Sequence, residues 1–376
     1  IAVAAAAALT ATSAFAEITF GAWLRVITGV GSNGEDVVMG TTNSWGGVRP
    51  ARLNAAGTSE DGKAGFKLDF YFDNDEIWGH DKNIRIGDNG YLWVKPIDQI
   101  QLSIGKFDGG ETGFRGDFCY GSWNWLRPIN WIADDEGLTF NGSHNDGLMA
   151  RITPIDNLVV LVQLPVMNAK WGGNNAGYVA KTETEDAKNT AADVFKNAAY
   201  MASYSIEGVG TLKAGFFGAD EEKTVEGKKY NQTGTVNVAF DLNAIENLYV
   251  TVGAFFDIAD KEMGEWHEKM KFTAGASYQV SDAMKFSVSG GYVKYMDKCA
   301  WLGNKDNAFQ IGAGVDYVIM DGLTLNADVR YKNVGYGKKG DDGSVSFLAG
   351  VVKSVGGNAS LQAGFQGSTN GCGLVQ

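Results

Sequence analysis

Between residues 309 and 332 the chain alternates apolar and polar side chains on both sides of a tight turn at Asp321-Gly322. Successive side chains on a strand point to opposite faces, so each half predicts a strand with one apolar and one polar face. Each predicted strand has roughly ten residues, the length that a tilted strand needs to cross a bilayer. The apolar faces consist of Phe309, Ile311, Ala313, Val315, Tyr317 and Ile319, and then of Leu323, Leu325, Ala327, Val329 and Tyr331.

The same alternation recurs along nearly the whole chain. It is clearest at residues 18–26, 66–72, 248–258, 270–280 and 359–366, and the connections between strands are alternately short and long. Short turns on one side and long loops on the other are typical of outer-membrane barrels. A soluble β-sandwich would use many shorter strands, and a β-helix would need a short fixed repeat. The pattern therefore predicts an all-β fold, a transmembrane antiparallel up-and-down β-barrel of about 16–18 strands with short periplasmic turns and long extracellular loops.

The first sixteen residues are small and apolar and end in Ala14-Phe15-Ala16 before Glu17. This pattern is typical of the apolar core and cleavage site of a secretory signal peptide. We therefore expect residues 1–16 to be the remnant of a signal peptide and residues 17–376 to form a single outer-membrane barrel domain. A short apolar strand start at residues 373–375 leads us to expect that the closing C-terminal strand is missing from this sequence. The predicted location is the bacterial outer membrane.

Composition excludes several other functions. The net charge of −12 argues against a nucleic-acid partner, because binding phosphates requires a basic surface. The three cysteines, Cys119, Cys299 and Cys372, fit no zinc-binding spacing. The chain has no phosphate-binding glycine loop, no His-Glu-x-x-His and no Gly-x-Ser-x-Gly sequence. We therefore expect that the protein is not an enzyme and that it uses no cofactor and no metal ion.

The polar faces of the predicted strands carry charges of both signs. A barrel of this size encloses water rather than a packed core, so these charges are expected to face the lumen. A mixture of signs favours a general channel over a strongly ion-selective one. The predicted inward-facing charges are Arg25, Lys67, Lys271, Arg330 and Lys332, with Asp69, Asp257, Asp316 and Asp328.

The connection at residues 108–136 is unusually rich in aromatic side chains. Its central part contains Phe114, Phe118, Tyr120, Trp123 and Trp125. Apolar patches of this size are seldom left in water, so the loop either packs against the inner wall or offers stacking faces to a sugar. The residues that could stack are Phe118, Tyr120, Trp123 and Trp125.

With its signal-peptide remnant, its strand–turn–strand repeat over residues 17–366 and its aromatic loop near the fifth strand, the chain resembles bacterial outer-membrane porins. The stretches 65–69 and 117–125 are similar to spirochaetal outer-membrane proteins. The resemblance implies a channel that is often trimeric, in which this loop folds into the lumen and its acids face arginines on the wall. The implied constriction consists of Asp108, Glu111, Arg115 and Asp117 on the loop and Arg25, Arg49 and Arg52 on the wall.

The sequence thus predicts a porin, a passive diffusion channel for small hydrophilic solutes and ions, surrounded by outer-membrane lipid. Two alternatives stay open at this point. One is a surface adhesin or structural barrel without an open pore. The other is a sugar-selective channel that uses the aromatic residues of the 108–136 loop.

Overall fold

The computed structural model describes residues 15–24, 28–32, 37–41, 51–72, 84–107, 146–165, 191–225, 227–260, 268–299, 305–333, 343–356, 359–369 and 373–375. Within them one sheet contains twenty strands. The first ten are β1 (Phe15–Leu24), β2 (Thr28–Ser32), β3 (Val37–Thr41), β4 (Ala51–Ser59), β5 (Ala64–Phe72), β6 (Ile84–Ile97), β7 (Ile100–Lys106), β8 (Asp146–Ile152), β9 (Leu158–Pro165) and β10 (Ala199–Ile206). The others are β11 (Gly210–Val225), β12 (Lys228–Ile245), β13 (Leu248–Ala259), β14 (Glu268–Ser281), β15 (Met284–Cys299), β16 (Lys305–Met320), β17 (Leu323–Lys332), β18 (Ser344–Gly356), β19 (Ala359–Ser368) and β20 (Gly373–Val375).

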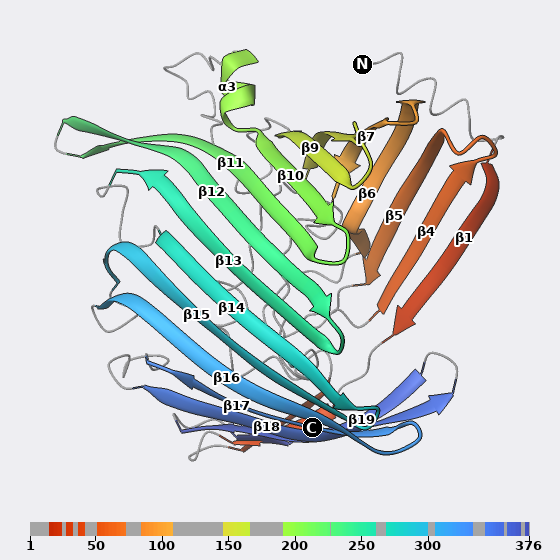
Figure 1. Cartoon of the computed structure of the whole chain (residues 1–376), viewed down its shortest axis with the longest axis vertical. Coiled ribbons are helices and arrows are strands. Elements are labelled where there is room, and N and C mark those ends of the chain that lie inside the picture. The colour runs from red at the N-terminus through yellow and green to blue at the C-terminus, as the bar shows by residue number, and fades with distance from the viewer. Residues whose placement is uncertain are drawn as a thin grey trace.

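The sheet is antiparallel and follows the order of the chain. From β4 to β20 each strand pairs with the next, while β1 pairs with β4 and β20 also pairs with β2. Strongly tilted strands wrap around a central space in Figure 1. Among the described residues the sheet is not closed, because it ends at β1 on one side and at β3 on the other. The predicted up-and-down, porin-like barrel fold is confirmed, and seventeen of the twenty strands have seven residues or more.

Short turns lie at one end of the barrel and longer connections at the other. At the turn end, β16 and β17 are joined by Asp321-Gly322, where Gly322 has the positive φ of 68° that glycine adopts without strain. At the loop end, residues 107–145 join β7 to β8, and these two strands pair directly with each other. The turn after β8 therefore lies at the same end as the turn before β7, as expected for a strand pair joined by one long loop.

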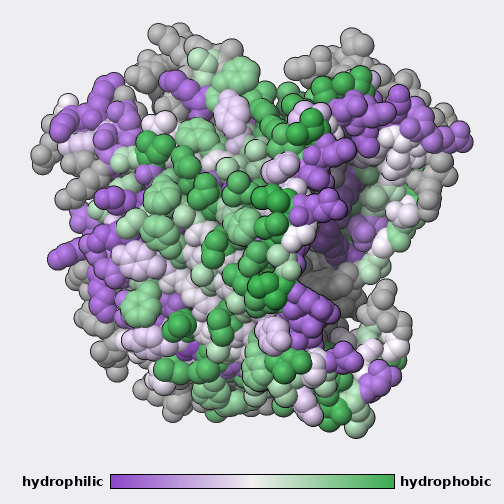
Figure 2. Space-filling model, viewed as in Figure 1, coloured by the Kyte–Doolittle hydropathy of each residue, from purple (hydrophilic) through white to green (hydrophobic). Residues whose placement is uncertain are grey.

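The chain is apolar outside and polar inside, the reverse of a water-soluble protein. Phe20 on β1 is 82% exposed and Ile311 on β16 is 60% exposed, whereas Asp69 on β5 is fully buried. Figure 2 shows hydrophobic residues gathered over the middle of the outer face. This arrangement confirms the predicted faces and suits a sheet whose outer surface meets lipid.

One short helix, α3 (Ala191–Lys196), lies at the loop end before β10. Its last turn leads directly into the strand, because Ala198 N–H donates a hydrogen bond of 3.3 Å to the Phe195 carbonyl. Within the described part of the chain, no helix is both long and apolar enough to cross a membrane.

Candidate functional site

The polar inner face is the candidate site. Of the residues predicted to form a constriction, Arg52 on β4 is described, and its side chain is 31% exposed. The other predicted constriction and stacking residues lie outside the described residues: Arg25, Arg49, Asp108, Glu111, Arg115, Asp117, Phe118, Tyr120, Trp123 and Trp125. The inner wall around Arg52 therefore defines the geometry of the site.

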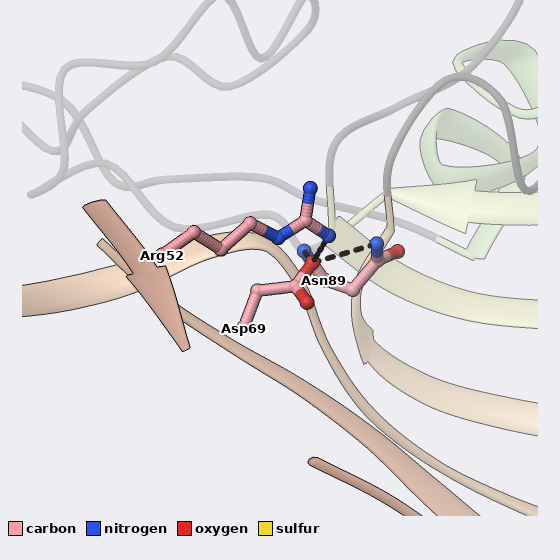
Figure 3. A network of polar contacts seen from close by, with 3 residues as sticks. All are labelled: Arg52, Asp69 and Asn89. Carbon is pink, nitrogen blue, oxygen red and sulfur yellow. Dashed lines mark hydrogen bonds and ion pairs between the residues drawn. The ribbon is translucent and has the colours of Figure 1, made fainter. Parts of the chain in front are cut away.

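Arg52 is held by a carboxylate on the neighbouring strand. Its Nη2 atom lies 2.5 Å from Oδ2 of Asp69 on β5, and its guanidinium lies 5.6 Å from the ring centre of Tyr71. The same Asp69 oxygen accepts hydrogen bonds from the backbone N–H and the side-chain amide of Asn89, at 3.1 Å and 2.9 Å. Figure 3 shows the three side chains meeting at this oxygen. We call Arg52, Asp69 and Asn89 the first polar triad.

A β-bulge in β6 makes this contact possible. Leu68 on β5 is opposite Gly90, but Phe70, two residues later, is opposite Ile86, so the register shifts between them. Residues 87–89 of β6 thus lie opposite the single residue Asp69 of β5. The Asn89 N–H is released from the regular ladder and donates to the Asp69 side chain instead. Bulges re-aim individual side chains in this way, and they are common at the rims of barrels and beside functional sites.

Two further triads repeat the arrangement of a cation, a carboxylate and a neutral donor on three successive strands. In the second, Lys213 on β11 lies 2.9 Å from Asp241 on β12, which accepts a 2.8 Å hydrogen bond from Thr251 on β13. In the third, Lys285 on β15 lies 2.8 Å from Asp316 on β16, which accepts a 2.8 Å hydrogen bond from Asn326 on β17. Both lie towards the turn end of the wall.

Other inner-face charges are also compensated by neighbours. Lys271 forms an ion pair with Glu268 and lies 5.1 Å from the ring centre of Phe255. Asp257 accepts hydrogen bonds of 3.2 Å from the Gln232 amide. Each of these charges thus has an opposite charge or a hydrogen-bond donor within contact distance, and the wall presents a polar surface with charges of both signs. Such a surface solvates ions of both signs and small neutral solutes.

One part of the inner face is apolar, which the sequence analysis did not predict. Phe107, Met149, Leu161, Ala199 and Met201 are buried together there. Their partly buried neighbours are Tyr91, Val159, Phe217 and Phe255. Phe107 is fully buried, and its ring centre lies 5.1 Å from that of Tyr91. The signal in the sequence was Leu158–Pro165, which is apolar on both faces except for Gln163 instead of alternating. We call this group the inner apolar patch.

A family model described as "Gram-negative porin" matches residues 2–336 of the 376-residue chain. The chain belongs to the Gram-negative porin family. Two solved porin-type structures share its fold. The anion-selective porin from Comamonas acidovorans is 15% identical, with 96% of this chain and 99% of that chain covered and a TM-score of 0.52. The Vibrio cholerae outer-membrane protein OmpT without loop L8 is 13% identical, with 89% and 98% covered and a TM-score of 0.50. No curated protein sequence is significantly similar to the chain.

Family and fold agree with the inside-out arrangement of the wall. The protein is an outer-membrane porin of the Gram-negative type, and its inner face lines a channel. Proteins of this family and fold are channels rather than enzymes. The resemblance of residues 65–69 and 117–125 to spirochaetal proteins stays a prediction.

Proposed function

We propose that this porin is a passive channel for small hydrophilic solutes and ions, with only weak preference for either sign of charge. The observation that carries the proposal is the repeated compensation of inner-face charge in the three polar triads. A channel with strong selectivity needs an excess of one charge sign along its wall, as in the charged rings of selective pores. Balanced pairs instead keep the lumen wet without favouring one ion.

We further propose that residues 108–136 fold into the lumen and narrow it. The inner apolar patch supports this, because Phe107, the residue directly before the segment, is fully buried within that patch. A segment with many aromatic side chains is stabilised by contact with an apolar wall, at about 25 cal/mol for each Å² removed from water. Asp108, Glu111 and Asp117 would then face Arg25, Arg49 and Arg52, with Arg115 beside them, across the narrowest section.

Deleting residues 112–126 tests this constriction. The deletion should raise single-channel conductance and admit larger solutes in planar-bilayer and liposome-swelling measurements. A shorter control deletion of residues 335–340, in the connection between β17 and β18, should leave both quantities unchanged. If the 112–126 deletion behaves like the control deletion, the segment does not narrow the pore.

The charges of the segment can be tested without shortening it. Asp117→Asn combined with Glu111→Gln should shift ion preference towards anions, and the shift should grow as salt falls, because screening weakens at low ionic strength. An ion preference that is unaffected at low salt would place these acids away from the ion path.

The family match favours neither of the two alternatives, a sugar-selective channel and an adhesin without a pore. Under the sugar hypothesis, replacing Trp123 and Trp125 with alanine should abolish current block by added oligosaccharides. Under our proposal such sugars do not block the native channel at all. The adhesin hypothesis requires a folded protein that carries no current. We also propose that the protein has no enzymatic activity.

We also propose that cleavage after Ala16 leaves Glu17 as the mature N-terminus.

We further propose that a strand closes the barrel between β1 and β19. The pairing of β20 with β19 on one edge and with β2 on the other supports this closing strand. In a cysteine-free background, cysteines at Ala22 and Ala363 should not form a disulfide, because an intervening strand would hold them about 10 Å apart. Rapid disulfide formation would show that β1 pairs directly with β19.

The outward-facing apolar surface is proposed to contact outer-membrane lipid, and the porin family suggests a homotrimer. Chemical cross-linking of the purified protein in detergent should give a ladder that ends at three subunits. A ladder that stops at one subunit would refute the trimer but leave the channel proposal intact.

A further inference from the structure

Arg151 is the inner-face cation that differs most from the charges of the polar triads. It lies on β8 opposite Gln101 of β7 and Leu161 of β9. It shares the inner face with Met149, which is buried, whereas Leu148, directly before Met149 on the opposite face, is exposed to the outside. Within the described ranges no side-chain hydrogen bond or ion pair joins Arg151 to another residue, unlike the cations of the triads.

The surroundings of Arg151 strengthen its field towards the channel. The side chain is half-buried next to the apolar Leu161 and the inner apolar patch, and water screens a charge less in such a place than on an open surface. The nearest turns carry Asp98 and Asp156, but both are exposed, so solvent and salt screen their charges. Arg151 is the last residue but one of β8 and thus lies near the turn-end mouth of the channel.

We propose that Arg151 is a specificity-determining residue that draws anions into the turn-end mouth, and that it favours solutes with carboxylate or phosphate groups. This inference rests on the proposed channel function. A guanidinium is always charged and presents a planar fork of donors that matches two oxygens of a carboxylate or phosphate, which a halide ion cannot use in the same way. The solutes that benefit most are therefore small oxyanions rather than chloride.

Reversal potentials across planar bilayers test the proposal with three variants of the full chain. Arg151→Gln should lower the chloride-to-potassium permeability ratio by about two-fold or more in 0.1 M salt, and by less in 1 M salt, because screening is stronger there. Arg151→Lys keeps the charge, so it should keep the chloride ratio but lose the preference for acetate over chloride. Lys353→Gln is the matched control, since it removes a positive charge at the same end from an exposed position outside the channel. It should leave both ratios unchanged.

Several outcomes would overturn the inference. A conducting Arg151→Gln protein with native permeability ratios at 0.1 M salt would show that Arg151 does not act on ions. An Arg151→Lys protein with the native acetate preference would refute the role of the guanidinium fork. A native protein that inserts but carries no current would refute the channel function itself, and this inference with it. Heat-dependent migration on gels confirms that each variant is folded before recording.

Discussion

Replacing Val329 with arginine would put a charge into the middle of the lipid-facing surface. Val329 is 49% exposed and lies six residues after Leu323, where β17 leaves its turn. A strand that rises about 3.4 Å per residue at a tilt of about 45° gains about 2.4 Å of height per residue. Val329 therefore lies about 14 Å above the turn end, near the centre of an apolar band about 25 Å tall.

The expected cost follows from this depth. Arginine on the lipid face costs about 2–4 kcal/mol at the midplane of a barrel and about 0–1 kcal/mol near the interfaces. At the midplane, a cost of about 4 kcal/mol lowers the folding equilibrium constant by about 700-fold, and a cost of about 2 kcal/mol lowers it by about 30-fold. Leu325, which lies two residues after Leu323, is closer to the interface, so Leu325→Arg should cost less than Val329→Arg.

Urea unfolding of the protein in lipid vesicles, followed by tryptophan fluorescence, measures these free energies. Asn326→Arg is the matched control on the same strand, because Asn326 faces the channel and lies 2.8 Å from the Asp316 carboxylate. It should be tolerated. If Val329→Arg were as stable as the native protein, or if Asn326→Arg were destabilised equally, the assignment of the two faces of β17 would be wrong.

Two further predictions concern charge. Asp241→Asn leaves Lys213 without its carboxylate, so the permeability ratio should move towards anions, and more so in dilute salt; a ratio that is unchanged in dilute salt would mean that the second triad does not face the ion path. In the turn between β4 and β5, hydrogen bonds from the Ser59 hydroxyl and the Lys63 backbone N–H hold the pKa of Asp61 below its usual value. A lowered pKa contributes stability that is present above the ordinary carboxyl pKa and is lost as the pH falls through the folded pKa. Ser59→Ala should therefore be less stable than the native protein at neutral pH, and the difference in unfolding free energy should become smaller as the pH is lowered below about 4. A difference that does not depend on pH would contradict this.

The sequence predicted the fold well because alternation is a local property. Phe309 and Ile311 appear in it as outward-facing residues, and Gln310 between them as inward-facing, without any knowledge of neighbouring strands. The structure confirms this, with Phe309 and Ile311 exposed and Gln310 buried.

The polar triads could not be predicted in the same way. The Arg52–Asp69–Asn89 contact depends on the register of three strands and on a bulge in β6, neither of which is written in one strand's pattern. Arg52 was predicted to face acids of the 108–136 loop, and that contact stays a prediction; the observed partner is a wall residue. The general alternation does not predict the inner apolar patch, because Leu161 and Met201 lie on the face that is polar in most other strands; its signal is the departure of β9 from alternation.

Single-channel recording of the purified protein in planar bilayers tests the central claim most directly. A porin with a charge-compensated inner wall should give stepwise current increases that scale with salt concentration, and its reversal potential should stay close to zero in a potassium chloride gradient. Folded protein that inserts into the bilayer but produces no steps, or that passes only one sign of ion, would contradict the claim of a weakly selective diffusion channel.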